Sequence, residues 1–397
     1  MRGDWLMNQR DFSELRRRLN PDRRNPSVIR GCYVTHDGQV ISTFAQPVFD
    51  MAQEENEKYM AIFKRVLSGT QGQNLLPVEF TAAQAMEGEE HRLLSALRDS
   101  ALKDDAAVEE FYRRVIEAIR EEGAQEVQSV EADQNACNYL ILLLHDGYDV
   151  PYKDQNDEND AERSTDLFSY MLCALCPVKP TRPGLSYFAA ESEFHNKASD
   201  WMVAPPEMGF LFPAFEERSA NLYVAMMYTR DSANPHEPLM RHVFGAEPFM
   251  PAPEQQETFQ AVLQEALGEE CSLSVVQAVQ ETVCGMLEER KADKRAEPLT
   301  LSRQDMKDVL QGCGVSEEKT AAFDEQYTQA FGAYAELPAV NMVPAKTFKV
   351  STPSVTIQVD PAHSDLIETR VIDGRRYILV LADGNVEVNG VSVNIDE

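Results

Sequence analysis

The sequence has no long hydrophobic run and few positively charged residues. Apolar stretches such as Tyr139–Leu144 are far shorter than the roughly 20 residues that a bilayer-spanning helix needs, so we expect no membrane segment. The chain has 397 residues, with 66 acidic and only 37 basic side chains and a formal net charge of -29. Such a surface repels phosphate backbones and anionic lipid, which disfavours DNA-binding and membrane-binding proteins.

Familiar catalytic signatures and a cysteine framework are also missing. The sequence contains no P-loop, no GxGxxG after a strand, no GxSxG and no HExxH motif. These absences favour a protein without enzymatic activity, and we expect no cofactor. The seven cysteines are scattered without scaffold spacing, which is typical of reduced thiols. The start MRGDWLMNQRDF does not have the pattern of an export signal, so we expect a cytoplasmic protein.

The chain does have the composition of a globular protein with a substantial core. Hydrophobic residues make up 43% and charged residues 26%, and the length exceeds that of one ordinary core. Helical periodicity is found at residues 51–67, 88–99 and 105–122. Apolar runs of strand length are YLILLLH, LFSYMLCALCPV, MGFLFPAF and NLYVAMMYT. We therefore predict an α+β fold, with a mixed or antiparallel sheet and flanking helices.

The pattern divides the chain into three expected segments. Residues 1–250 form the α+β core domain, which begins with a basic helix ended by Pro21. Residues 251–335 have the periodicity of amphipathic helices. Residues 336–397 form a small β-hairpin unit, because apolar alternation there is interrupted by turn dipeptides. These dipeptides are Asp373-Gly374, Asp383-Gly384 and Asn389-Gly390.

The stretch LILLLHDGYDV contains the most prominent candidate residues, His145 and Asp146. Asp-Gly between apolar runs is a strong hairpin signal, because a type I′ turn needs positive φ at both central residues. The stretch YVTHDGQVI, around His36, has the same form. We interpret both as backbone turns.

The alternative is a catalytic site around His145. Imidazole and carboxylate groups can hold a metal ion or transfer a proton, as in a metal-dependent hydrolase. The residues of this hypothesis are His145, Asp146, Asp149 and His195, with Trp201 as a wall of the pocket. In this hypothesis the aromatic segment around His195 and Trp201 lines a pocket or a partner surface. We favour the other interpretation, in which its aromatic side chains fill the core.

Two further polar motifs are interpreted as structural. Cys173 and Cys176 lie three residues apart on an expected strand, so their thiols point to opposite faces and suit a core better than a zinc or redox site. The acidic stretch 153–166 resembles a calcium loop only in part, because Asn159 replaces the glycine and Thr165 the final glutamate. We expect a solvated loop there, with weak cation binding as the alternative.

Positive charge is concentrated near the N-terminus. The candidate ligand-binding arginines are Arg17, Arg18, Arg23 and Arg24. Their charge suits a phosphate, an RNA strand or an acidic partner. Packing of the helix end on the chain's own acidic body explains them without a ligand, and we favour that interpretation.

Several long phrases together resemble one family. They are LRRRLNPDRRNPSVIRGCYV, EEHRLLSALRDSALKD, NYLILLLHDGYDVPYKD, LSYFAAESEFHNKASDWMVAPPEMGFLFPAF and IETRVIDGRRYILVLADGNVEVNG. The sequence is similar to the DUF4317 proteins, a bacterial family of unknown function found mainly in Firmicutes, from about Met7 to the C-terminus. The resemblance implies a cytoplasmic bacterial protein that starts at Met7, and it brings no known activity or site residues.

The sequence leaves three candidate functions. The first is a non-catalytic binding or scaffold protein that engages a protein partner or a small ligand. The second is the metal-dependent hydrolase around His145, and the third is nucleotide or RNA binding through the N-terminal arginines. We favour the first, because the apolar residues are committed to cores and no catalytic motif is present. The sequence does not indicate an oligomeric state.

Overall fold

The computed structural model describes residues 7–21, 27–126, 137–153, 159–293, 296–382, 384, 386–388 and 390–393. The chain divides into two compact units. The first is Trp5–Ala252 with Lys294–Glu297, and the second is Pro253–Asp293 with Pro298–Glu397. The expected division into three segments stays a prediction.

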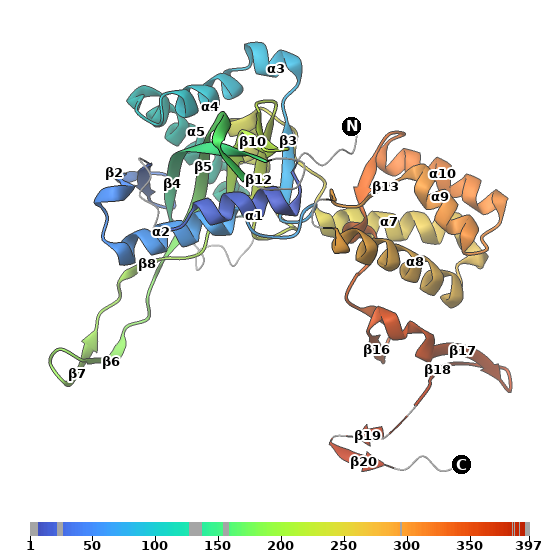
Figure 1. Cartoon of the computed structure of the whole chain (residues 1–397). Helices are drawn as coiled ribbons and strands as arrows, with labels where there is room; N and C mark the ends of the chain where they lie inside the picture. Colours follow the sequence, from blue (N-terminus) through green and yellow to red (C-terminus); the bar gives the residue numbers. More distant parts are fainter. Residues whose placement is uncertain are drawn as a thin grey trace. The chain divides into compact units, whose positions relative to one another are not determined.

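The first unit is built on an eight-stranded sheet whose neighbouring strands pair antiparallel (Figure 1). The order is β2 (Val40–Pro47), β1 (Val28–Val34), β4 (Asn138–Lys153), β5 (Asn159–Pro180), β9 (Met208–Phe212), β12 (Val224–Thr229) and β3 (Leu75–Glu79), with β8 (Trp201–Val203) paired to the end of β5. The apolar runs predicted as strands form its centre, which confirms the α+β fold.

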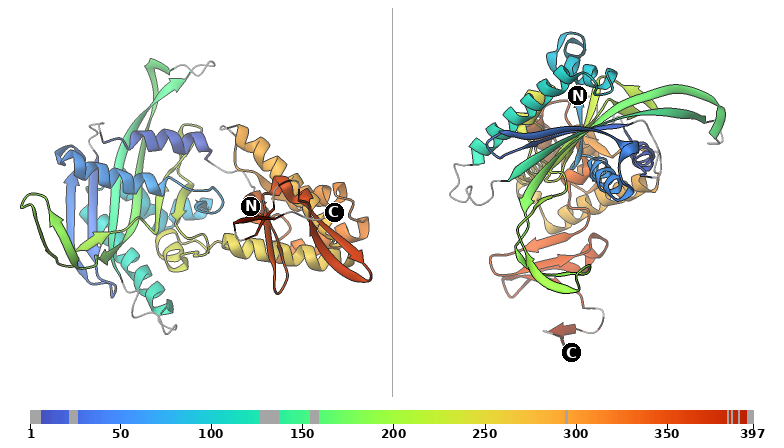
Figure 2. Two further views of the ribbon diagram at one scale, coloured as in Figure 1. Left: turned by 90° about the horizontal axis from the view of Figure 1, so that it is seen from below. Right: turned by 90° about the vertical axis from the view of Figure 1, so that its left-hand side faces the viewer.

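Both faces of the sheet are covered. Ile141 and Leu143 of β4 belong to the core on one face, and Leu142 and Leu144 to the core on the other. The helices are α4 (Glu89–Asp99) and α5 (Asp105–Glu126) on the first face, and α1 (Gln9–Arg18) and α2 (Gln53–Val66) on the second (Figure 2). A strand buried on both faces needs apolar residues at every position, which explains the unbroken run YLILLL.

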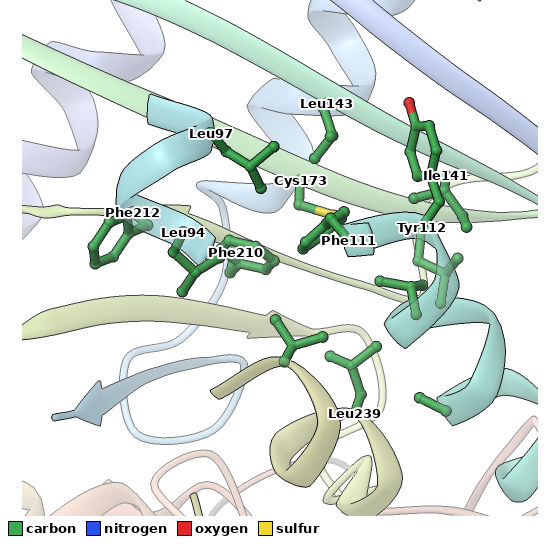
Figure 3. Packing of buried hydrophobic residues seen from close by; sticks show 14 of the residues in the cluster. Leu94, Leu97, Phe111, Tyr112, Ile141, Leu143, Cys173, Phe210, Phe212 and Leu239 are labelled. Carbon is green, nitrogen blue, oxygen red and sulfur yellow. The ribbon is translucent and has the colours of Figure 1, made fainter. Parts of the chain in front are cut away.

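Aromatic packing joins the helices to the sheet on the face of α4 and α5 (Figure 3). The rings of Phe111 on α5 and Phe210 on β9 lie 6.1 Å apart, and both side chains are fully buried. Leu94 and Leu97 of α4 belong to the same core. Each such side chain stabilises the fold by about 1.5–3 kcal/mol through its burial.

Shorter elements complete the first unit. They are the 3-10 turn Val48–Asp50, α3 (Ala82–Glu87), β6 (Gly184–Phe188), β7 (Glu193–Lys197), β10 (Ala214–Glu216), β11 (Ser219–Asn221), α6 (Glu237–Leu239) and the π-helical turn Met240–Phe244. Four of these strands form two separate two-stranded ribbons, β6 with β7 and β10 with β11.

The second unit begins with helices around a core of their own, which includes Phe259, Val283, Phe323 and Tyr327. Its elements are α7 (Ala252–Leu267), the 3-10 turn Gly268–Glu270, α8 (Leu273–Ala292), β13 (Thr300–Ser302), α9 (Arg303–Gly312), α10 (Glu317–Phe331), β14 (Glu336–Pro338) and α11 (Ala339–Met342). The helical periodicity of this region is thus confirmed.

Three hairpins follow in the second unit. They are β15 (Phe348–Ser351) with β16 (Thr356–Val359), β17 (Ile367–Ile372) with β18 (Arg375–Val380), and β19 (Val386–Val388) with β20 (Val391–Val393), with the 3-10 segment Pro361–Leu366 after the first. Asp373 and Gly374 have φ of 50° and 76°, which confirms the predicted turn between β17 and β18. Asp383 and Asn389 lie outside the described residues.

The interpretation of His145 and Asp146 as a turn was wrong. β4 runs through them without interruption, and Gly147 pairs with Ser169 of β5. The alternation of inward side chains continues beyond the apolar run, since Tyr148 and Val150 are buried in the same core as Leu144. That pattern outweighs the Asp-Gly signal. The turn around His36 is confirmed, because β1 and β2 pair across it and Gly38 has a φ of 79°.

The expected loop 153–166 was also wrong in part. β5 begins at Asn159 and pairs with the end of β4, so the polar residues that follow Asn159 belong to a long antiparallel ribbon. Strand pairing satisfies backbone groups whatever the side chains, which is why a polar sequence did not prevent it. Residues 154–158 lie outside the described residues.

Candidate functional site

His145 and Asp146 point to opposite faces of the sheet, because successive residues of a strand alternate. The imidazole of His145 is half-buried and lies 2.9 Å from the hydroxyl of Ser169. Burial lowers the pKa of this imidazole below its ordinary value. Asp146 is buried beneath α1 on the other face, so the two side chains do not share a site.

Asp146 is the centre of a buried polar cluster. Its carboxylate accepts hydrogen bonds from Ser27 (3.1 Å), from Tyr170 (3.0 Å) and from Arg18 of α1 (3.4 Å). Arg18 also donates to the carbonyl of Gly147 and lies over the ring of Tyr148, 4.7 Å from its centroid. These contacts fasten α1 to the sheet.

A small cavity adjoins this cluster. Arg18, Ser27 and Asp146 line it together with the apolar side chains of Met60 and Leu144. Its volume of about 10 Å³ is room for roughly one water molecule. The geometry therefore suits a structural polar cluster and offers no space for a substrate.

The other residues of the catalytic hypothesis lie elsewhere in the first unit. His195 is on β7 and interacts with Glu191 (3.1 Å) and Glu193 (3.4 Å) of its own ribbon. That ribbon continues from Pro180, on the order of 30 Å along β5 from the residue opposite His145. Asp149 is exposed on β4. The structure does not bring the four residues together.

Within the described ranges, no cluster of three or more His, Cys, Asp or Glu side chains is arranged to hold a metal ion. Cys173 and Cys176 belong to the cores on opposite faces of the sheet, which confirms the interpretation from their spacing. Burial raises the pKa of the Cys176 thiol to about 12 and that of Cys173 further. Both are core thiols in their neutral form.

The arginines at the end of α1 have different environments. Arg16 donates to the carbonyl of Leu67 and to Ser13, and Arg18 reaches Asp146, so both contact the chain's own body. Arg17 is exposed and lines an open concavity together with Lys64 of α2. Arg23 and Arg24 lie outside the described residues.

An arrangement of Thr229, His236 and Glu122 was not predicted from the sequence. The Nε2 atom of His236 lies 3.2 Å from the Thr229 hydroxyl, and its Nδ1 atom lies 3.0 Å from Glu122. This geometry resembles a hydroxyl–imidazole–carboxylate triad. However, Thr229 is 1% exposed and donates its hydrogen to the Asp231 carbonyl. A substrate cannot reach it, and the contacts fasten the loop after β12 to α5.

The expectation that aromatic residues near His195 fill the core was wrong in part. Phe210, Phe212 and Phe215 are fully buried, whereas Phe194 and Trp201 are exposed. The ribbon formed by β6 and β7 stands outside the eight-stranded sheet, and nearly all its residues are exposed. Leu185 is 75%, Tyr187 55% and Phe194 64% exposed. Trp201 on β8 is also exposed, at 58%. A ribbon of two strands is too narrow to bury these side chains.

The ribbon has one apolar and one polar face. Tyr187 pairs with Phe194, and their rings lie 5.1 Å apart. Leu185 lies two residues from Tyr187 and therefore on the same face. The opposite face carries Glu193, His195 and Lys197, which follow one another at alternate positions of β7, together with Phe188 opposite Glu193. Figure 1 shows β6 and β7 extending beyond the sheet of their unit.

These features define an α+β protein with a buried polar cluster around Asp146 and an exposed apolar face on the β6–β7 ribbon. The chain belongs to the DUF4317 family, since the model of this domain of unknown function matches residues 7–391. No curated protein and no solved structure matches it. Among the described helices, none is long and apolar enough to cross a membrane.

Proposed function

We propose that this chain is a non-catalytic, cytoplasmic binding protein that engages a protein partner through the β6–β7 ribbon. The observation that carries the proposal is the apolar face of Leu185, Tyr187 and Phe194, which is exposed on a two-stranded ribbon separate from the eight-stranded sheet. An isolated two-stranded hairpin is only marginally stable in water. Pairing with or cover by a partner stabilises such a ribbon, and clustered exposed apolar groups are typical of interaction sites.

A protein partner suits this surface better than a small molecule. Small ligands bind in concave pockets that enclose most of their surface. The face around Tyr187 and Phe194 is a ribbon surface, and aromatic side chains are enriched at the centres of protein interfaces. A metal-dependent hydrolase has less support, because His145 and His195 have separate environments.

Photo-crosslinking tests the proposal. A photoreactive phenylalanine analogue at position 187 samples the apolar face, whereas the same analogue at Ser186 samples the opposite face. Irradiation of the producing cells is expected to give a discrete protein adduct from position 187 and a weaker one from position 186. Adding Phe194→Ser is expected to remove the adduct, while Phe49→Ser, at an exposed site outside the ribbon, leaves it. Failure of position 187 to form any adduct contradicts the proposal.

Binding of a polyanion is a second candidate with one observation in its favour. Lys64, contributed by α2, joins Arg17 at an open concavity on a protein that is otherwise strongly acidic. Lysine and arginine recognise phosphate groups through charge and hydrogen bonds. Polyanion binding has less support than protein binding, because Arg16 and Arg18 already donate hydrogen bonds to carbonyl groups of the protein itself.

A further inference from the structure

The charge pattern of β7 is complementary to itself. Its sequence Glu193-Phe194-His195-Asn196-Lys197 carries a negative charge at one end and a positive charge at the other. Antiparallel pairing about the centre of this strand places each charged end against the opposite charge. As far as the structure describes the chain, β6 pairs with one edge of β7 and no strand pairs with the other. An exposed strand edge is a ready template for a further strand.

We propose that the partner of the ribbon is a second copy of this chain, and that the two β7 strands pair antiparallel with His195 opposite His195. This inference rests on the proposed function and names the partner. It joins two ribbons into one four-stranded sheet about a two-fold axis. Two-fold dimers are the commonest assemblies of identical chains, and each copy then uses the same surface.

On the polar face, this register forms two ion pairs. Glu193 of one copy lies directly opposite Lys197 of the other, and the reverse pair forms across the axis. Opposite charges at directly paired positions stabilise an antiparallel sheet, whereas like charges destabilise it. A shift of one residue places Glu193 opposite Asn196 and loses both pairs. The charges therefore select the register centred on His195.

On the apolar face, the same register extends the aromatic contacts of each ribbon. Phe194 of one copy lies opposite Asn196 of the other, so the two Phe194 rings are diagonal neighbours. Diagonal positions are about 7–8 Å apart, within reach of aromatic side chains. Each Phe194 ring already lies 5.1 Å from Tyr187. The dimer thus forms a row of four rings, Tyr187 and Phe194 from each copy.

The edge of β6 fits this role less well. Its sequence Gly184-Leu185-Ser186-Tyr187-Phe188 has no charged side chain to set a register or a partner. A second copy also has a definite advantage over an unrelated protein, because charge complementarity is present within β7 itself. The formal charge of -29 on each chain opposes association, so we expect a dimer that dissociates on dilution.

Charge reversal with full-length protein tests the inference. The molar mass is measured by light scattering over a range of protein concentrations. Wild type is expected to approach twice the chain mass, and Glu193→Lys and Lys197→Glu, each alone, to shift dissociation to at least tenfold higher concentration. An equimolar mixture of these two variants is expected to form a heterodimer, since every cross-strand pair then joins opposite charges. The variant carrying both reversals is expected to regain the homodimer.

Lys103→Glu is the matched control, because it makes the same charge change at an exposed residue outside the ribbon. It is expected to leave the dimer intact. A second measurement tests the register. Directly paired residues have Cα atoms about 4.5–5.5 Å apart, which suits a disulfide. His195→Cys is expected to form an inter-chain disulfide under mild oxidation. Glu191→Cys is not, because its two copies lie on the order of 27 Å apart in this register.

The outcomes separate this inference from the proposed function. A wild-type chain that stays monomeric at all concentrations, or a heterodimer that fails to form from two monomeric variants, overturns self-pairing. If the photoreactive group at position 187 then joins a different protein, the proposed function stands without the inference. If it joins no protein, both are overturned.

Discussion

Arg18, in the last turn of α1, lies 3.4 Å from the carboxylate of Asp146 in the middle of β4. The side chains are 14% and 4% exposed, so the pair is largely shielded from water. Arg18 also donates to Gly147 and packs on the ring of Tyr148. An arginine in the last turn also interacts favourably with the helix dipole. One residue therefore joins the end of the first helix to the centre of the sheet.

Replacing Arg18 is expected to destabilise the first unit. Arg18→Ala removes the positive charge beside Asp146, while Ser27 and Tyr170 still hold the carboxylate in its buried position. Breaking a buried ion pair in this way costs about 3 kcal/mol of stability. Urea unfolding followed by circular dichroism measures the loss. Arg17→Ala removes an exposed neighbouring arginine and is expected to change stability by less than about 0.5 kcal/mol. Equal effects from the two variants contradict this role of Arg18.

The sequence predicted the elements whose patterns are uniform. Unbroken apolar runs identified β4, β5, β9 and β12, because only a strand covered on both faces needs apolar residues at every position. Helical periodicity identified α2, α4 and α5 for a similar local reason. The hairpin at Asp373-Gly374 followed from the positive φ that its turn requires.

The sequence did not predict polar residues whose environment is created by distant parts of the chain. Asp146 has the local signature of a turn, but Arg18 and Ser27, more than a hundred residues earlier, make its burial possible. His236 similarly depends on Glu122 of α5. The sequence did contain a signal for a continuing strand, which is the alternation beyond Leu144 with Tyr148 and Val150 on the same face. Exposed aromatics such as Phe194 depart from the rule that such residues are inside, and our proposal of a partner rests on them.

Glu122 is expected to make folding stability depend on pH. Burial raises its pKa, but the hydrogen bond and charge of His236 outweigh this and hold the pKa below its ordinary value of 4.5. A carboxyl group with a lowered pKa in the folded state stabilises the fold above its unfolded pKa. This contribution is lost as the pH falls through the folded pKa.

Glu122→Gln is therefore expected to cost about 2 kcal/mol at pH 7, the typical value of a hydrogen bond to a charged group. The difference from wild type is expected to shrink as the pH falls below about 4.5. Urea titrations at several pH values measure it. Glu109→Gln, at an exposed position of the same helix, provides the comparison. A cost for Glu122→Gln that does not vary with pH contradicts this role of the Glu122 carboxylate.

The cysteines are expected to differ in reactivity. The thiolate is the reactive form, and burial raises the pKa of Cys32 to about 11 and that of Cys176 to about 12. Cys271 and Cys313 are only partly buried. At pH 8, iodoacetamide is expected to modify Cys271 and Cys313 at least tenfold faster than Cys173 and Cys176, as measured by peptide mass spectrometry. After denaturation in urea, the rates are expected to converge. Early modification of Cys173 and Cys176 in the folded protein argues for a functional CxxC motif.

The surface around Arg17 is expected to bind polyanions weakly. Arg16, which also lines the concavity, is engaged by the carbonyl of Leu67, so Arg17 and Lys64 are the basic residues there that offer their charge to a ligand. Two phosphate contacts give a slope of log affinity against log salt of about -1.4 for a single strand. The surrounding charge of -29 opposes binding further.

Fluorescence anisotropy with a labelled single-stranded RNA is therefore expected to detect no micromolar binding at 0.15 M salt. The double variant Arg17→Glu with Lys64→Glu is expected to give the same result as the wild type. The opposite outcome is tight, salt-dependent binding of the RNA by the wild type that the double variant abolishes. In that case nucleic-acid binding at the end of α1 becomes the better supported of the two candidate functions.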